Sequence, residues 1–272
     1  MQAAICLGGQ ALSVDLAQPV ELAIELDFAG PQPRHFGAPR ASSRPFESGD
    51  FKGSVRRGAS CNCELLTLIP HCNGTHTECA GHLTREGLDA YRLAPAGLTP
   101  ALLLSVTPEA PGEEHTDPVP QPGDRLITRA ALLRAWPPEL PFGPQALIIR
   151  TLPNTPDKRV RDYSDQTPPY LSREAAQLLV ERDIRHLIVD VPSLDRARDA
   201  GRLSAHRVFF GLPRGSTALE SAIRATATVT ELAFVPDSVT DGPGLLALQV
   251  PPLCGDAVPS RPLWYALLAE DP

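Results

Sequence analysis

The sequence has few aromatic residues, no long apolar run and no excess of positive charge. Aromatic residues make up 5% of the 272 positions, and the formal net charge is -7. This acidic balance argues against a basic surface for nucleic acid or for a membrane surface. No apolar run approaches the roughly 18 residues that a membrane-spanning helix needs. We therefore expect neither nucleic acid nor a membrane among its partners.

Two further signatures are missing. Residues 1–9 carry no basic segment ahead of an apolar one, so we expect no signal peptide. The six cysteines then favour reduced thiols and a cytoplasmic location. The H-E-x-x-H pattern is also absent, which argues against the helix-borne metal site of a protease.

Against these absences stands a clear α/β pattern. The apolar runs 146–151 and 186–191 flank an amphipathic stretch, 172–182, which begins at the helix-capping residue Ser172. Strand, helix and strand at this spacing predict a parallel pairing. We expect one α/β domain over residues 1–272, built on a central sheet.

The patterns that predict the remaining elements are weaker. Further strands are expected at 3–7, 21–26, 59–69, 101–106, 226–235 and 245–250, and further helices at 85–93 and 128–136. Residues 28–58 are rich in Pro, Gly, Ser and Arg, which predicts a long loop of the kind that is usually functional or mobile. Residues 192–210 are also expected to form a loop.

The most informative stretch is residues 70–82, P-H-C-N-G-T-H-T-E-C-A-G-H. It holds three of the seven histidines and one carboxylate. Neutral imidazole and carboxylate are the usual ligands of zinc and similar ions. His76 and Glu78 share a face if the backbone is extended, and a bulge at the intervening Asn-Gly pair brings His71 to the same face. The sequence therefore predicts a divalent metal held by these three residues.

Other residues are candidates for the surrounding chemistry. His82 lies farther out and suits an acid or base, because imidazole titrates near pH 6.5. Thr75, or a backbone N–H near Gly74, is a candidate oxyanion donor. Arg150 ends an apolar strand and could bind a substrate carboxylate, although a fold-stabilising ion pair is an equal alternative.

The cysteines offer rival interpretations. Cys61, Cys63, Cys72 and Cys79 could form a structural zinc site, but C-x-C is tighter than the usual ligand spacing. Cys79 could be a nucleophile beside one of the histidines, or simply a small buried hydrophobe.

The segment G-T-H-T-E-C-A-G-H resembles the signature of the cyclase-like metal-dependent hydrolases, which include bacterial kynurenine formamidase and isatin hydrolase. That signature reads H-x-G-T-H-x-D-x-P-x-H, and Gly74, Thr75, His76 and His82 match it. The likeness continues in order through V-D-L-A-Q-P-V, L-I-I-R-T, V-D-V-P-S-L-D, A-H and T-E-L. It covers most of the chain.

Three positions depart from that signature. Glu78 stands where the family usually has Asp, so the carboxylate reaches about one methylene farther. His71 is one residue farther from the glycine, and Ala80 replaces a proline. These departures bear on whether the family's chemistry is preserved.

The resemblance implies a swivelling β/β/α cyclase-like fold with a mixed central sheet. It implies a metal-dependent hydrolase that cleaves an amide, lactam or related acyl bond of a small molecule, at C–N bonds other than peptide bonds, as an arylformamidase does. His206 and Glu231 would join Glu78 around a second ion, giving one or two Zn or Mn ions per chain, and Glu231 would also be catalytic. It further implies a homodimer or homotetramer.

Other readings of these residues stay open. Glu231 lies within an apolar strand, where an unpaired carboxylate is costly, which favours a function. His206 could instead be a surface residue. His35, His115 and His186 are expected to be structural or solvated. On the same scaffold, the protein could be a non-catalytic ligand-binding protein, or a metal-dependent cyclase or dehydratase.

Overall fold

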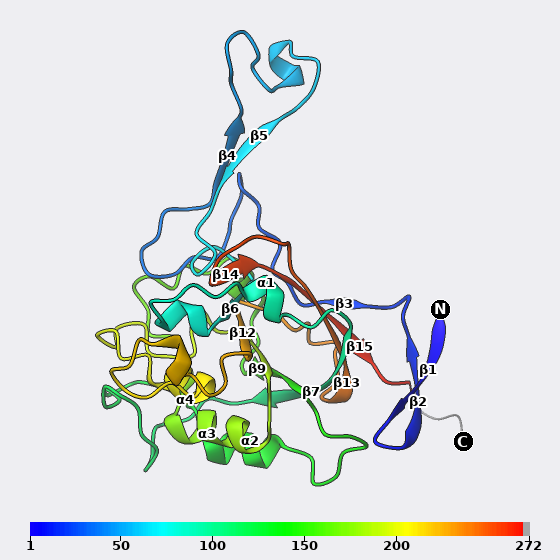
Figure 1. The fold of residues 1–272 in the computed structure, drawn as a ribbon, viewed down its shortest axis with the longest axis vertical. Coiled ribbons are helices and arrows are strands. Elements are labelled where there is room, and N and C mark those ends of the chain that lie inside the picture. The colour runs from blue at the N-terminus through cyan, green and yellow to red at the C-terminus, as the bar shows by residue number, and fades with distance from the viewer. Residues whose placement is uncertain (269–272) are drawn as a thin grey trace.

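The computed structural model describes residues 1–268 and is organised around a nine-stranded mixed sheet (Figure 1). In spatial order the strands are β14 (Ala257–Pro259), β6 (His76–Cys79), β12 (Thr228–Glu231), β11 (His186–Val189), β9 (Ala146–Thr151), β7 (Leu98–Val106), β13 (Gly242–Gln249), β15 (Arg261–Ala266) and β3 (Val20–Glu21). Strands β12, β11, β9 and β7 run parallel, and the strands on either side of them pair antiparallel. This arrangement is the mixed α/β sheet that the sequence predicts.

The parallel centre of the sheet is apolar and fully covered. Every residue of β9 and β11 is buried, as expected for parallel strands with both faces packed. Leu187 lies opposite Leu147 in their parallel ladder, so the predicted pairing of these two segments is confirmed.

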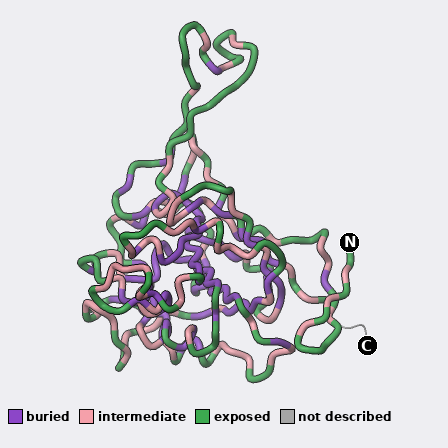
Figure 2. The backbone as a smooth tube through the Cα atoms, in the orientation of Figure 1, coloured by how far each residue is buried: buried purple, intermediate pink, exposed green. Residues whose placement is uncertain are grey.

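Alternation along β7 divides the core between the two faces of the sheet. Leu102 and Leu104 join a cluster with Leu147 and Leu179, whereas Leu103 packs in a second cluster on the other face. Figure 2 shows that the buried residues lie mostly at the centre of the molecule. Successive side chains of a strand point to opposite faces, so one strand supplies both layers.

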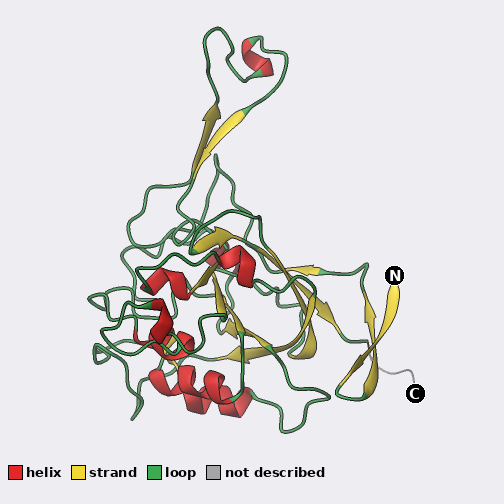
Figure 3. Cartoon of the chain, viewed as in Figure 1, coloured by secondary structure: helices red, strands yellow, loops and turns green. Residues whose placement is uncertain are grey.

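Helices cover the first of these faces (Figure 3). They are α2 (Arg129–Ala135), α3 (Arg173–Glu181) and α4 (Ser204–Phe210), whereas the short α1 (Ala90–Leu93) packs through Ala90 against Cys79 and Val258 in a separate cluster. Thr128 caps α2 by accepting the Ala131 N–H at 3.0 Å, and Ser172 caps α3 by accepting the Ala175 N–H at 2.9 Å. Within residues 1–268 no helix is both long enough and apolar enough to cross a membrane.

Smaller elements decorate the main sheet. They are the hairpin β1 (Gln2–Leu7) and β2 (Gln10–Asp15), the parallel pair β8 (Leu126–Ile127) and β10 (Tyr170–Leu171), the ribbon β4 (Ser42–Pro45) and β5 (Glu64–Thr67), and the 3-10 turns η1 (Val55–Arg57), η2 (Ala80–Leu83), η3 (Pro156–Arg159) and η4 (Leu219–Ser221).

Two segments expected to be loops contain regular structure. Residues 28–58 include β4, which pairs with β5 and leaves the body of the molecule as a ribbon. Residues 192–210 include α4, a helix of seven residues whose N-terminus is held by the Asp195 carboxylate. Both β4 and α4 depend on contacts between residues that are distant in the sequence, which a local sequence pattern does not reveal.

The strand expected at 21–26 is shorter than predicted. Only Val20 and Glu21 pair as β3, and the chain then leaves the edge of β15. Ala23 instead bridges to Ala233, which follows β12. Because the chain changes its pairing partner, the ladder between β3 and β15 ends after Glu21, although the alternating apolar residues continue beyond it.

Candidate metal centre

Two neighbouring strands place three of the predicted ligands on one face of the sheet. His76 and Glu78 are two residues apart on β6 and are both buried, as the parity argument requires. In the antiparallel ladder Glu231 of β12 lies opposite His76. The other face carries Thr77 and Thr230, whose hydroxyls are 2.7 Å apart.

A turn, and not the β-bulge that the sequence analysis expects, brings His71 close to His76 and Glu78. The Asn73 side chain accepts the Ile69 N–H at 2.8 Å, and Gly74 has a φ of 106°, a conformation that favours glycine. His71 Nδ1 thereby lies 2.9 Å from Glu78 Oε2. The Asn-Gly pair has the bending role that the sequence predicts.

His206 reaches the centre from α4. The Asp195 carboxylate accepts the backbone N–H groups of Ala205 and His206 and also meets His206 Nδ1 at 2.7 Å. This leaves His206 Nε2 pointing inward, 2.8 Å from Glu78 Oε1 and 3.3 Å from Glu231 Oε1.

All three imidazoles are oriented in the same way. His76 Nδ1 lies 3.0 Å from the Gly74 carbonyl, His71 Nε2 lies 2.9 Å from Asp256 Oδ2, and His206 Nδ1 is held by Asp195. The second nitrogen of each ring faces a glutamate. Metal-binding histidines are typically fixed in this way, with one nitrogen held by an oxygen acceptor and the other directed at the ion.

Unsatisfied atoms at the centre indicate what belongs there. Within residues 1–268, His76 Nε2, Glu78 Oε1 and His206 Nε2 are buried without a properly aligned hydrogen-bond partner. Such groups are costly when left unpaired. Divalent cations are suitable partners for such atoms, because imidazole nitrogen and carboxylate oxygen are their ordinary ligands. The residues present therefore fit a metal.

Ligand-type atoms of these residues form three overlapping groups. Within each group the atoms lie no more than 4.8 Å apart, and the groups are His71, His76 and Glu78, then Glu78, His206 and Glu231, and finally His71, His82 and Asp256. Glu78 is common to the first two groups. The geometry therefore accommodates one ion or two that share this carboxylate.

The buried pairs of histidine and carboxylate have protonation states that favour binding of a cation. Burial raises the pKa of Glu78, but the adjacent His206 and His82 outweigh it and hold that pKa well below its usual value. Burial likewise opposes protonation of His206, yet Glu78 and Asp195 raise its pKa well above the usual value. The carboxylates are thus ionised, and a bound cation replaces protons that the imidazoles otherwise hold.

The site opens on the side of His71, His82 and Asp256. Their side chains are 24%, 29% and 42% exposed, whereas His76 and His206 are almost fully buried. The His82 ring comes from η2, lies 4.2 Å from the His71 ring and has its Nδ1 3.4 Å from Asp256 Oδ2. His82 therefore lines the open side, as an outer acid or base requires.

Asp256 is a site residue that the sequence analysis missed. It is 185 residues away from His71 and lies in the loop before β14, where its carbonyl accepts the Cys79 N–H. The neighbouring His71 and His82 hold the pKa of its carboxyl well below the usual range. Nothing local to Asp256 signals this role, because β14 reaches the site only through its pairing with β6.

Two predicted site residues do not join the cluster. The Thr75 hydroxyl donates to the Leu232 carbonyl and accepts the Ile24 N–H, so it is occupied by the backbone. The Arg150 guanidinium is buried and binds Ser105, two carbonyls and Asp241. For Arg150 the fold-stabilising alternative describes its surroundings. Its expected role in substrate binding, like that of Thr75 as an oxyanion donor, is corrected by these contacts.

The cysteine alternatives do not match the structure. Cys61 and Cys63 are exposed near the end of the β4–β5 ribbon, whereas Cys72 and Cys79 are buried beside the histidines. None of the three ligand groups within residues 1–268 includes a cysteine. Burial raises the pKa of Cys79 to about 12, and its thiol donates to the Leu88 carbonyl, so it is no thiolate nucleophile.

The remaining histidines have different surroundings. His115 is exposed and paired with Glu174, and His186 is buried with its Nδ1 2.9 Å from the Thr228 hydroxyl. His35 is buried and neither ring nitrogen has a hydrogen-bond partner within residues 1–268. Burial lowers its pKa to about 4, against the opposing charge of Glu231. His35 is thus a neutral imidazole close to the centre, which its loop context did not indicate.

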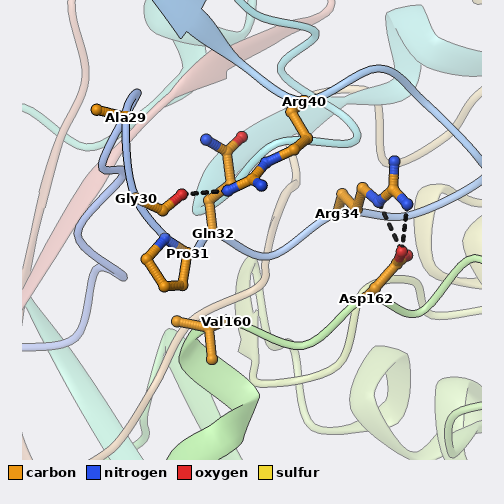
Figure 4. A pocket seen from close by; sticks show the side chains of 8 residues that line it. All are labelled: Ala29, Gly30, Pro31, Gln32, Arg34, Arg40, Val160 and Asp162. Atoms are coloured by element: carbon orange, nitrogen blue, oxygen red, sulfur yellow. Dashed lines mark hydrogen bonds and ion pairs between the residues drawn. The ribbon is translucent and has the colours of Figure 1, made fainter.

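A separate cavity of about 440 Å³ lies on the surface away from these groups (Figure 4). Arg34 is paired there with Asp162, and Arg40 donates to the Gly30 carbonyl. Both guanidinium groups already have partners, and no residue of the ligand groups lines this cavity.

Comparison with known proteins places the geometry in a wider context. A family model described as "Putative cyclase" matches residues 14–196. No curated protein matches the sequence. The solved structures similar to this chain include a predicted metal-dependent hydrolase from Bacillus stearothermophilus, at 15% identity, a TM-score of 0.58, and coverage of 91% of this chain and 98% of that one.

Isatin hydrolases are also similar in structure. Isatin hydrolase A from Labrenzia aggregata, bound to benzyl benzoate, matches at 18% identity with a TM-score of 0.57 and coverage of 91% and 93% of the two chains. Isatin hydrolase A from Ralstonia solanacearum matches at 16% identity with a TM-score of 0.56, covering 91% of each. These likenesses confirm the expected cyclase-like fold.

Proposed function

The chain belongs to the putative cyclase family, and from this premise we propose that it is a metal-dependent hydrolase of a small molecule. The bond cleaved is an amide, lactam or related acyl bond, a C–N bond other than a peptide bond, as in arylformamidases. One observation carries the proposal: three buried ligand atoms without an aligned hydrogen-bond partner lie beside an opening lined by titratable side chains.

The centre has the composition of a hydrolytic metal site and not of a structural one. Its donors are imidazoles and carboxylates, and one side remains open to solvent through His71 and His82. Structural zinc sites are usually closed by four protein ligands rich in cysteine, whereas catalytic sites keep a position for water or substrate. At this site a bound divalent cation would supply Lewis-acid chemistry, lowering the pKa of water and polarising a carbonyl.

We assign zinc or manganese, with one or two ions per chain. His71, His76 and Glu78 would hold one ion, and Glu78, His206 and Glu231 a second. The mixed nitrogen and oxygen donors suit both metals, because imidazole favours zinc and carboxylate also favours manganese.

The chain's own residues then serve proton transfer and orientation. His82 faces the open side and can deliver a proton to a leaving nitrogen, since a histidine in reach of the reacting group is a common general acid. Asp256 contacts both His82 and His71 and therefore orients two rings at once. Glu231 is buried against His76 and His206, and its carboxylate can hold a water by accepting its hydrogen bond.

The decisive experiment combines metal analysis with product analysis. Purified protein should contain zinc or manganese by elemental analysis, and it should add one water to a panel of aryl formamides and lactams, isatin among them, detected by mass. Chelation should abolish turnover and added Zn²⁺ or Mn²⁺ should restore it. An isomeric or dehydrated product would favour a cyclase or dehydratase.

A matched pair of variants isolates the site. The double variant His76→Ala/Glu78→Ala removes two buried ligands, and we expect it to lose both metal and turnover. His115→Ala removes an exposed histidine that is paired only with Glu174, so metal content and turnover should persist. Turnover by the double variant at the wild-type rate would refute the proposal, and metal without turnover would favour a non-catalytic binding protein.

A further inference from the structure

A cavity of about 270 Å³ lies against helix α4, and its lining differs from that of the metal centre. Its charged lining residues are four arginines and one aspartate: Arg173, Arg202, Arg207, Arg214 and Asp117. None of the metal-ligand groups within residues 1–268 contributes a side chain to it. The chain as a whole has a net charge of -7, so the cavity is a local excess of positive charge that the overall composition does not predict.

Two neighbouring helices, α3 and α4, bring these residues together (Figure 1). Arg173 is the first residue of α3. Ser204 and Arg207 are three positions apart on α4 and therefore share one face of that helix, which borders the cavity. His206 lies on a different face of α4, where its Nε2 is directed at Glu78. The cavity and the metal centre thus border different faces of the same helix.

Arg207 is held in place without a counterion. Its Nε donates to the Arg202 carbonyl at 3.1 Å, and its Nη1 donates to the Pro213 and Ser216 carbonyls at 3.1 and 2.8 Å. These acceptors are neutral, and no carboxylate within residues 1–268 forms an ion pair with Arg207. A guanidinium fixed by carbonyls alone keeps its full charge and a defined orientation, so it can bind an anion with little further loss of side-chain entropy.

The other three arginines leave the cavity short of negative charge. Asp117 lies 3.0 Å from Nη2 of Arg214 and 3.9 Å from Nε of Arg202. Arg173 is half-buried, and its side chain has no ion-pair partner among residues 1–268. One aspartate therefore serves four guanidinium groups, and those of Arg173 and Arg207 pair with no carboxylate. Like charges held together repel one another, so an anion placed among them is stabilised by each.

We propose that this cavity binds the phosphate group of a small molecule. Guanidinium groups present paired N–H donors that match the oxygens of phosphate, and such charge-assisted contacts are stronger than those between neutral groups. A phosphate group carries close to two negative charges at neutral pH. It can therefore neutralise Arg173 and Arg207 together, whereas a single carboxylate balances only one of them.

The size of the cavity and the charge of the chain favour a small ligand over a polymer. Pockets for drug-sized molecules have volumes of roughly 300 to 1,000 Å³, so a cavity of about 270 Å³ suits a compact molecule. An extended polyanion such as nucleic acid would also meet the net negative charge of the surrounding protein, which opposes its approach.

Isothermal titration calorimetry with inorganic phosphate, at pH 7.5 and low ionic strength, tests the proposal. We expect the wild-type protein to bind one phosphate per chain in this cavity. Arg173→Gln and Arg207→Gln should each weaken binding about tenfold or more, because each removes charge-assisted hydrogen bonds. Arg56→Gln is the matched control: Arg56 is exposed in η1, has no ion-pair partner among the described residues, and lies outside the cavity, so its loss should leave the affinity unchanged.

Asp117→Asn should have the opposite effect. It removes the only carboxylate that lines the cavity and releases Arg202 and Arg214, so phosphate should bind roughly two- to fivefold more tightly. A gain of affinity does not arise from a damaged fold, so this variant remains informative if Arg207→Gln proves unstable. Circular dichroism checks the fold of each variant.

Divalent metal ions also bind phosphate, so the metal centre needs its own control. The His76→Ala/Glu78→Ala variant should retain the affinity of the wild type for phosphate, whether or not the protein is a hydrolase. Glycerol phosphate should compete with inorganic phosphate, and acetate should not. No binding up to about 10 mM phosphate, an unchanged affinity in Arg173→Gln, a loss of binding in the metal-site variant, or equal competition by acetate would overturn the proposal.

Discussion

Asp195 and His206 are joined by a contact of 2.7 Å between Oδ2 and Nδ1, and the same carboxylate accepts two backbone N–H groups at the start of α4. One side chain therefore fixes both the helix and the ring that it carries. The contact leaves only Nε2 of His206 for the centre. A helix of seven residues gains from Asp195 the orientation that its own length cannot supply.

Replacing Asp195 should weaken metal binding without removing a ligand. Asp195→Asn keeps the shape but loses the charge that holds the His206 tautomer, and loss of such an outer contact typically costs 10- to 100-fold in affinity. Competition with a chromophoric chelator measures this change. Asp199→Asn, which alters a nearby carboxylate that within residues 1–268 accepts hydrogen bonds only from backbone N–H groups, should leave affinity unchanged. Equal effects of the two variants would contradict the prediction.

Asp256 should act on turnover more than on metal content. It touches His71 and His82 from the open side, so Asp256→Asn should lower kcat roughly tenfold while KM and bound metal change little. Asp256→Glu keeps the charge and should recover part of the rate. Steady-state kinetics alongside elemental analysis distinguish these effects. A loss of metal in proportion to the loss of kcat would assign Asp256 to metal retention instead.

His186 should make the protein acid-sensitive. Burial lowers its folded-state pKa to about 4, whereas the unfolded value is near 6.5. The unfolded chain therefore binds the proton more tightly, and stability falls as the pH drops from about 6.5 towards 4. Between pH 7 and 5 this one residue should remove about 2 kcal/mol from the free energy of unfolding.

Urea denaturation at the two pH values measures that effect. His186→Gln should lose about 2 kcal/mol less than wild type over this interval, whatever its starting stability. His115→Gln, at an exposed position, should follow the wild type. An unchanged pH dependence in His186→Gln would show that the acid sensitivity arises elsewhere.

Lys158 and Asp190 form a buried ion pair of 2.8 Å that should be costly to break on one side. Lys158 also donates to the Thr151 carbonyl, so Lys158→Met removes a hydrogen-bond donor from both the Asp190 carboxylate and the Thr151 carbonyl. We expect a loss of about 3–5 kcal/mol in the free energy of unfolding. The double variant Lys158→Met/Asp190→Asn should recover part of that loss.

An exposed ion pair supplies the control. Arg185 and Asp183 are 3.1 Å apart with both side chains more than half exposed, so Arg185→Met should cost no more than about 1 kcal/mol. Denaturation by urea at pH 7.5 compares the variants. A Lys158→Met variant as stable as Arg185→Met would refute the assignment of a buried, fold-stabilising pair.

The local rules that succeeded are those of short range. The period of two placed His76 and Glu78 on one face of β6, and the serine cap at Ser172 placed the start of α3. The apolar runs gave β9 and β11 and their parallel pairing. Each of these depends on residues within a few positions of one another, which a sequence displays directly.

Only the tertiary structure decided which distant residues complete the centre and which leave it. His206 arrives on a helix within a presumed loop, Asp256 through the pairing of β14 with β6, and Arg150 is drawn to Asp241 instead. The sequence by itself determined the ligand types and the strand that presents two of them. The order of strands in the sheet decided the rest, because contacts across many residues depend on which strands become neighbours.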